Sequence, residues 1–406
     1  MSGEPQSGPR AALRVPAYRR WFAAQIFSAS GSATQLVGMT WLIASATDSG
    51  VALGALTFAI FIPVLVFGPW AGRVIDHVDR RVLLLWTQLA FLAIAVALIV
   101  MAILGSVVAP VLYGLALATG LVNALDAPAR QVYVMDVLPR RMLPSAIGLY
   151  EVMMNSARVL GPGIAGLLLL SGDTVLCFVF NALGLLPAIV ALLRNRGQSS
   201  HAPDRAPAGD PPSMWAGLRW SFAHPRVLIV LVLAATGGML FNLAPTVPLM
   251  ATRSFALGGD GYGLLSAVFG AGALLGALWA ASRHRPPTGR SVVRLAWGTG
   301  AAVVLAAAAP AWGRFALGLA VAGALGIWFI SRANAYVQLA APTGLRGQVM
   351  SVWNMAIPGM NPFTGLLAGF VADAVSARVG FGLSGALFLV FGTVALVVSA
   401  RAARRS

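Results

Sequence analysis

The stretch from Gly148 to Gly166, GLYEVMMNSARVLGPGIAG, carries a carboxylate, an amide and a guanidinium inside an otherwise apolar segment. At about 100° per residue on an α-helix, Glu151, Asn155 and Arg158 fall on one narrow stripe. Charged groups that face hydrocarbon are costly, so this stripe must face protein or water. The pattern therefore indicates a functional site on a membrane helix.

The chemistry that these residue types offer is proton binding. Burial favours the protonated form of the Glu151 carboxyl group, whereas Arg158 favours the ionised form. The two residues lie roughly 10 Å apart along a helix, too far for a direct ion pair. We expect proton binding at Glu151, with Asn155 and Arg158 beside it, to be coupled to a conformational switch. Two alternatives remain open: a permanent structural pairing through other helices, and binding of an anionic substrate group by Arg158.

Composition places this stripe in a polytopic helical membrane protein. Of 406 residues, 58% are hydrophobic and 10% are charged, and the mean hydropathy is +0.82. The formal charge of +16 comes entirely from arginine, and its distribution follows the positive-inside rule rather than indicating nucleic-acid binding. Hydropathy predicts about twelve spans: residues 22–46, 51–72, 82–104, 108–127, 144–171, 174–193, 227–251, 261–281, 292–311, 314–336, 349–373 and 380–400.

Two related halves are expected, with both termini in the cytosol. Most arginines then lie on the cytosolic face, and only Arg253, Arg314 and Arg378 lie outside. Residues 195–213 are rich in Pro, Gly, Ser and Ala, which is typical of a flexible linker. The predicted organisation is an N-terminal six-helix bundle, a cytosolic linker and a C-terminal six-helix bundle, at residues 1–194, 195–225 and 226–406.

Internal similarity supports a duplication. It aligns Pro139 with Pro342, Tyr150 with Trp353 and Gly166 with Gly369. Such symmetry is typical of secondary transporters that bind substrate between their halves. The alignment places Asn354 at the position of Glu151 and Asn361 at that of Arg158, so proton coupling is expected in the first half.

A charged loop between the second and third spans reads GRVIDHVDRR, from Gly72 to Arg81. It resembles the loop signature G-x-x-x-D-R-x-G-R-R/K of the major facilitator superfamily, with His77 and Asp79 as departures. The resemblance implies a cytosolic gate latched by this loop, in which an acid at the inner end of the fourth span partners the loop arginine. The residues assigned to gating are Gly72, Asp76, Arg80, Arg81 and Asp126. The alternative is that the arginines only orient the protein.

The opening stretch resembles a second signature of that superfamily, the antiporter pattern G-x8-G-x3-G-P-x2-G-G of the fifth span. The matching residues are Gly148, Ala157, Gly161, Pro162, Ala165 and Gly166. The resemblance implies export by antiport, whereas the alternative is plain helix packing by small residues. Residues 14–170 are also similar to the exporter branch that contains enterobactin exporters and macrolide efflux proteins.

Polar residues on other spans predict a central substrate cavity. Its expected lining is neutral and hydrogen-bonding with some apolar contacts, which suits an amphipathic organic molecule: Gln25, Ser28, Ser32, Gln35, Met39, Asn242, Thr246, Trp353, Asn354 and Asn361. Met239 is a further apolar contact. For any one amide, an interhelical hydrogen bond is the alternative.

An enzyme is not expected, because the chain has no Lys for a Walker motif and no metal-ligand spacing. No catalytic residue, metal or cofactor is assigned. The predicted function is proton-coupled export of an amphipathic drug, siderophore or secondary metabolite across a bacterial cytoplasmic membrane. Its partners are the substrate, protons and membrane lipids, without nucleic acid, and a monomer is expected. Alternatives are a lysophospholipid flippase of the same superfamily and a non-transporting sensor or scaffold.

Overall fold

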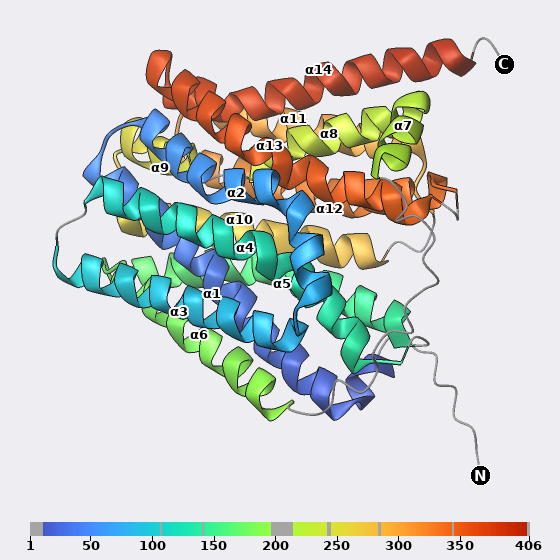
Figure 1. Ribbon diagram of the computed structural model, residues 1–406. Coiled ribbons are helices and arrows are strands. Elements are labelled where there is room, and N and C mark those ends of the chain that lie inside the picture. Colours follow the sequence, from blue (N-terminus) through green and yellow to red (C-terminus); the bar gives the residue numbers. More distant parts are fainter. Residues whose placement is uncertain are drawn as a thin grey trace.

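The structure is a computed structural model that describes residues 11–105, 108–139, 142–195, 214–241, 245–282, 286–342 and 345–403. The described chain is almost entirely helical (Figure 1). In chain order the elements are the 3-10 helix η1 (Ala11–Arg14), α1 (Pro16–Ala46), α2 (Gly50–His77), α3 (Arg80–Ile103), α4 (Ala109–Val137), α5 (Leu143–Leu169), α6 (Val175–Arg194), α7 (Met214–Ala223), α8 (Pro225–Phe241), α9 (Val247–Leu249), the π-helix η3 (Met250–Ser254), α10 (Gly259–Ser282), α11 (Gly289–Ala307), α12 (Trp312–Ala340), α13 (Arg346–Ala374) and α14 (Ala377–Ala403).

Local sequence explains where several helices begin. α1 and α8 start at Pro16 and Pro225, where proline's fixed φ suits the first turn and its missing N–H is no loss. Ser49 caps α2 by accepting from the amide of Ala52 at 3.3 Å. Asp79 caps α3, because its carboxylate accepts from the amides of Arg81 and Val82 at 2.9 and 3.2 Å. Asp79, which stands where the superfamily loop signature has Gly, therefore acts as a helix cap.

Eight helical segments in the described chain are long and apolar enough to cross a membrane: Gly50–Gly68, Arg80–Ile103, Ala109–Val134, Val175–Arg194, Gly259–Ala280, Trp312–Ala340, Gln348–Ala374 and Ala377–Ala395. A ninth results if α7 and α8, which meet at a bend of 107°, form one span. Of the remaining helices, α1, α5 and α11 are 31, 27 and 19 residues long. Their length suits a span.

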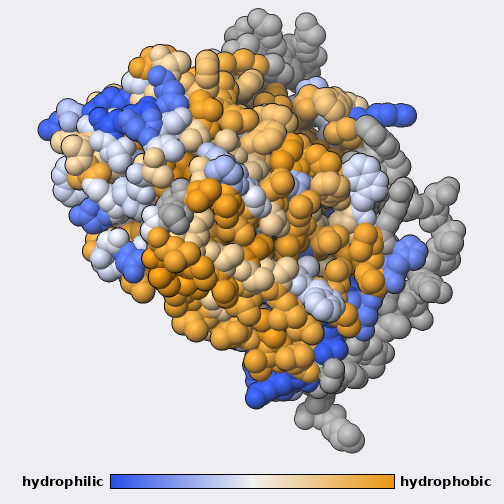
Figure 2. Space-filling model, turned by 60° about the vertical axis from the view of Figure 1, so that its left-hand side comes forward, coloured by the Kyte–Doolittle hydropathy of each residue, from blue (hydrophilic) through white to orange (hydrophobic). Residues whose placement is uncertain are grey.

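The outer surface fits a membrane environment. Figure 2 shows a broad hydrophobic surface across the middle of one face, with the most hydrophilic residues toward its edges. Many large apolar side chains are exposed, among them Trp86 at 67%, Leu167 at 66% and Leu317 at 68%. A soluble monomer rarely exposes such an area, so we assign this surface to contact with lipid.

The two ends of the helical bundle differ in their contacts. We call α1 to α6 the N-half and α8 to α14 the C-half. The Asp48 end is the end with the α1–α2 turn, on the left in Figure 1, and the Arg80 end is the end with the α2–α3 turn. The start of α1 and the end of α14 both lie at the Arg80 end (Figure 1).

The halves meet mainly through two helix pairs, α2 with α13 and α5 with α10, and the stacked rings of Trp41 and Tyr262 add a contact between α1 and α10. Glycine allows the backbones to touch: a Cβ on Gly54 would lie 2.7 Å from the carbonyl oxygen of Gly365, and one on Gly263 would lie 2.6 Å from that of Gly166. Close approach of this kind is a general means of packing membrane helices. The largest buried apolar cluster includes Met39 and Leu169 of the N-half and Phe269 of the C-half, so the hydrophobic core crosses between the halves.

One helix lies within the segment expected to be a linker. Its Gly217 packs against the backbone and side chain of Gln348, near the start of α13, so α7 is attached to the C-half. Residues 196–213 lie outside the described residues.

The glycine contact between α5 and α10 makes a testable prediction. A methyl group at Gly166 would overlap the backbone of Gly263, whereas Gly163 on the same helix faces open space. We expect Gly166→Ala to lower the free energy of unfolding by about 1–3 kcal/mol, the usual cost of overpacking. Gly163→Ala adds the same methyl group and gains helix propensity without a clash. Reversible unfolding in detergent measures both, and equal stability of the two variants would contradict the packing described.

Candidate functional site

A buried ion pair lies on α4. Asp126 and Arg130 are one helical turn apart, and the Arg130 guanidinium contacts the Asp126 carboxylate with side chains only 1% and 10% exposed for Asp126 and Arg130, respectively. Both lie inside the candidate span Ala109–Val134. Charge at this depth is tolerated only with partners, which makes the pair a functional-site candidate.

Neighbouring helices complete this pair into a polar network. From α3, Thr87 and Gln88 donate to the Asp126 carboxylate at 2.6 and 2.9 Å. From α1, Gln25 accepts from the Arg130 guanidinium at 2.7 Å. Ser28, also on α1, donates to the Gln88 side-chain oxygen at 3.3 Å. The network of Gln25, Ser28, Thr87, Gln88, Asp126 and Arg130 therefore ties α1, α3 and α4 together.

Sequence reasoning found only part of this network. Gln25 and Ser28 were expected in a substrate cavity and Asp126 in a gate, while Arg130, Thr87 and Gln88 were missed. The available signal was the stretch DAPAR, which puts an acid and an arginine four residues apart on one face of a helix.

The expected pairing of the loop arginine was wrong. Arg80 contacts Asp136 at 2.5 Å, not Asp126, because Arg80 is the first residue of α3 and Asp136 lies in the last turn of α4. Asp126 lies deeper in the bundle, where Arg130 is its partner. Burial raises the pKa of the Asp136 carboxyl group above its usual range, and the Arg80 guanidinium opposes that shift.

The rest of the charged loop is anchored to the N-half. The Arg81 guanidinium donates to the backbone oxygen of Leu192, near the end of α6, at 2.6 Å. Nearby, Arg20 donates to the Asn195 side-chain oxygen at 3.2 Å. The Gly72 position and the Asp76 side chain are not described, so the assignment of both residues to gating stays a prediction.

At the opposite end a second charge cluster joins the two halves. Arg253 of η3 contacts Asp48 of the N-half at 2.7 Å and Asp373 of the C-half at 2.8 Å. Asp373 also accepts from the amides of Gly50 and Val51 at 2.8 and 2.9 Å. An acid from α13 therefore caps the first turn of α2, where the helix dipole favours negative charge. We call Asp48, Arg253 and Asp373 the outer latch.

In the part of the chain that the structure describes, the ion pair between the halves is that of Arg253 with Asp48 in the outer latch. A side-chain hydrogen bond between Thr40, near the end of α1, and Tyr262, in the first turn of α10, also joins the halves toward the Asp48 end. At the Arg80 end, Arg80 with Asp136 and Arg81 with Leu192 bond within the N-half. The polar links that the structure records between the halves therefore hold one end of the bundle.

The small residues of the antiporter signature are used for packing. Gly161 lies against α1, where its carbonyl accepts from Thr34 at 3.1 Å. Gly166 lies against α10, Ala157 and Ala165 are buried, and Pro162 lies within α5. The side chains of Glu151, Asn155 and Arg158, and the Gly148 position, lie outside the described residues. Their assigned roles therefore stay predictions.

The expected cavity residues have several different surroundings. Gln35 accepts from Asn181 of α6 at 2.6 Å, so this amide makes an interhelical bond, as do Gln25 and Ser28. Ser32 donates to the backbone of its own helix. The others that the structure describes are buried: Met39, Thr246, Trp353 and Asn361. Met239, Asn242 and Asn354 lie outside the described side chains.

Comparison with known proteins identifies the family. A family model described as "transmembrane secretion effector", of the major facilitator superfamily, matches residues 7–405. The multidrug efflux pump Tap of Mycolicibacterium fortuitum is 26% identical over 384 residues, which cover 92% of this chain and 93% of Tap. The staphyloferrin A transporter of Staphylococcus aureus is 22% identical over 245 residues, so the match spans 61% of that protein.

Solved structures show the same fold. The crystal structure of a bacterial homolog of the human lysosomal transporter Spinster, in an inward-facing conformation, has a TM-score of 0.69 at 14% identity and covers 94% of this chain and 95% of that one. The POT family transporter PepTSo has a TM-score of 0.70 at 13% identity, and the match covers 95% of this chain and 99% of that one. Together with the family match, this fold places the chain in the transmembrane secretion effector family of the major facilitator superfamily, as a membrane transporter and not an enzyme.

Proposed function

We propose that the chain is a proton-coupled secondary exporter of an amphipathic organic compound that works by alternating access. It has twelve spans in two six-helix bundles, 1–194 and 226–406, joined by the cytosolic segment 195–225, and acts as a monomer in a bacterial cytoplasmic membrane. The substrate class is a drug, siderophore or secondary metabolite, which fits the relatives named as a multidrug efflux pump and a siderophore transporter.

The observation that carries this proposal is the difference between the ends. Polar links between the halves gather at the Asp48 end, in the outer latch and the Thr40–Tyr262 hydrogen bond, while Arg80 and Arg81 at the arginine-rich Arg80 end bond within the N-half. The positive-inside rule puts the Arg80 end in the cytosol. The structure then corresponds to the state that receives substrate from the cytosol, and export requires the outer latch to open.

Proton coupling is assigned to the first half. Glu151 supplies the titrating carboxylate on α5, together with Asn155 and Arg158. In the aligned sequence of α13, the neutral amides Asn354 and Asn361 stand at the positions of Glu151 and Arg158. The Asp126–Arg130 pair supports this assignment, since the N-half already holds buried charge among α1, α3 and α4. A local charge change at such depth can bias a conformational equilibrium. Arg80, Arg81 and Asp136 join Gly72 and Asp76 as gate residues on the cytosolic side.

Replacing the Glu151 carboxyl group separates proton coupling from transport. In proteoliposomes, we expect Glu151→Gln to abolish export driven by an imposed pH gradient and to retain substrate counterflow, because exchange needs no net proton movement. Wild-type uphill export by this variant would remove Glu151 from the coupling role. Counterflow in neither protein would favour a sensor or scaffold, and scrambling of labelled lysolipid would favour a flippase.

The buried Asp126–Arg130 pair gives a further prediction. Asp126→Asn leaves Arg130 as an unpaired buried charge, so we expect a loss of about 3–5 kcal/mol in the free energy of unfolding. The double variant Asp126→Leu with Arg130→Met removes both charges and should recover most of that stability without recovering uphill export. Stability is measured by reversible unfolding and export in proteoliposomes. Full export by the double variant would show that the pair is only structural.

A thiol-labelling experiment tests the outer latch. Cys177 is the single cysteine, so a Cys177→Ser background with Ser266→Cys places one thiol on α10 at a site that is 5% exposed. Adding Arg253→Ala should raise the rate of labelling by an impermeant maleimide up to about fivefold, as expected for partly exposed ion pairs worth about 1 kcal/mol or less. Arg314→Ala removes an exposed arginine at the same end and serves as the control. Equal rates in the two variants would show that the outer latch does not hold this end closed.

A further inference from the structure

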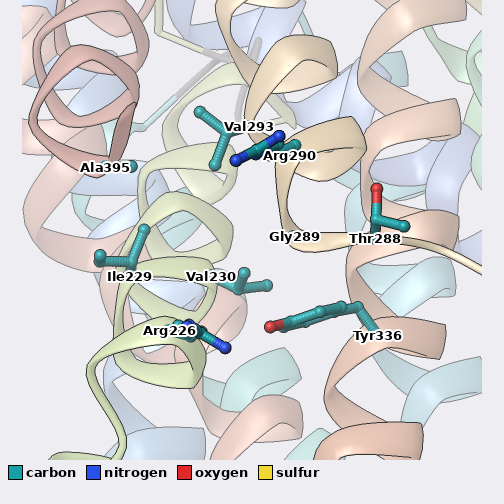
Figure 3. A pocket seen from close by; sticks show the side chains of 9 residues that line it. All are labelled: Arg226, Ile229, Val230, Thr288, Gly289, Arg290, Val293, Tyr336 and Ala395. Carbon is teal, nitrogen blue, oxygen red and sulfur yellow. The ribbon is translucent and has the colours of Figure 1, made fainter. Parts of the chain in front are cut away.

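A pocket of about 330 Å³ opens at the Arg80 end of the C-half (Figure 3). It lies between the starts of α8 and α11 and the ends of α12 and α14. Arg226, Arg290 and Tyr336 contribute its polar groups, and Val230 and Val293 are buried apolar residues of its wall. This volume is at the small end of the range for ligand sites, about 300–1,000 Å³.

The polar groups come from different helices. In Figure 3 the Tyr336 side chain points toward Arg226, and Arg290 lies on the opposite side of the pocket. Within the described chain, neither guanidinium pairs with a carboxylate. Thr288 and Ser291 form a capping box at the start of α11. An anion in the pocket would therefore find unpaired side-chain donors.

The corresponding region of the N-half holds no such pocket-lining valine, because a tryptophan side chain fills it. Aligning the prolines that begin α1 and α8 puts Val230 at the position of Trp21. The Trp21 indole is 1% exposed and packs on Tyr133, with ring centroids 5.9 Å apart. Aligning Pro139 with Pro342 matches Tyr133 with Tyr336. The second half thus keeps the tyrosine and replaces the indole with a much smaller side chain.

The charged residues of this region also differ between the two halves. Arg81 and Arg290 are each the second residue of their helix, α3 and α11. The N-half contains a matching acid, Asp136, which pairs with Arg80, but the alignment puts Leu339 at that position in the C-half. The C-half has therefore kept one basic residue, Arg290, and gained another, Arg226, at the position of Ala17, while it lost the aromatic filler and the acid that occupy this region of the N-half.

We propose that this pocket binds the phosphate group of an anionic phospholipid. Arg226 and Arg290 would hold the phosphate oxygens and Tyr336 would donate its hydroxyl, while Val230 and Val293 contact the apolar part next to the headgroup. Guanidinium groups are well suited to phosphate. The pocket lies at helix ends, the level of lipid headgroups, where Tyr and Arg are favoured and where cytoplasmic leaflets carry anionic lipid.

The test compares lipid and soluble phosphate on the full-length protein. Purified protein in phosphatidylcholine nanodiscs is supplemented with phosphatidylglycerol or with inorganic phosphate, and the melting temperature and retained lipid are measured by thermal unfolding and native mass spectrometry. We expect phosphatidylglycerol to raise the melting temperature and to be retained, and inorganic phosphate to do neither. Equal stabilisation by inorganic phosphate would overturn the assignment to a lipid.

Matched variants locate the effect. Arg226→Ala with Arg290→Ala should lose the phosphatidylglycerol response, whereas Arg219→Ala with Arg346→Ala removes the same charge from exposed sites on α7 and α13 outside the pocket and should keep it. Val230→Trp, which restores the indole of the N-half, should also lose the response while both arginines remain. An undiminished response in Arg226→Ala with Arg290→Ala, or in Val230→Trp, would show that the lipid binds elsewhere.

Discussion

The need to pair charge inside hydrocarbon governs the N-half. Asp126 and Arg130 neutralise each other on α4, and each also bonds to a side-chain amide, Asp126 to that of Gln88 and Arg130 to that of Gln25. Removing one partner would leave a buried charge without compensation, which is among the most costly changes a protein can suffer. As a result α1, α3 and α4 are tied together, and we infer that they move as one unit.

The interface between the halves is built on a different principle. Glycines let α2 approach α13 and let α5 approach α10, and aromatic pairs such as Phe58 with Phe363 pack beside them. The ion pairs come from the outer latch, whose residues are partly exposed and so bind weakly. Strong links within a half and weaker links between halves suit a transporter that rocks two rigid bodies against each other. The asymmetry between Trp21 and Val230 shows that duplicated halves need not keep the same filling at their ends.

Features written in local sequence could be predicted. The helices that match hydropathy spans, the close packing at Gly166 and the pairing of Arg80 with a carboxylate follow from apolar runs, a small residue at a contact, and a charge at a helix start. The α5 stripe of Glu151, Asn155 and Arg158 remains a prediction.

Features that depend on helix register could not be predicted. Arg80 meets Asp136 rather than Asp126 because of where α3 begins beside the last turn of α4, and no local pattern encodes that offset. The cap that Asp373 places on α2 joins residues far apart in the chain. Gln35 faces Asn181 on another helix, although its span alone allowed a cavity position equally well.

The central claim is that one end closes as the other opens. It is tested most directly by measuring both ends in a cysteine-free background, with spin labels at Val51 and Val375 for the Asp48 end and at Val82 and Arg346 for the Arg80 end. All four positions are exposed. Double electron–electron resonance across a pH titration should show the two distances changing in opposite directions. Distances that change together, or that ignore pH at both ends, would contradict proton-coupled alternating access.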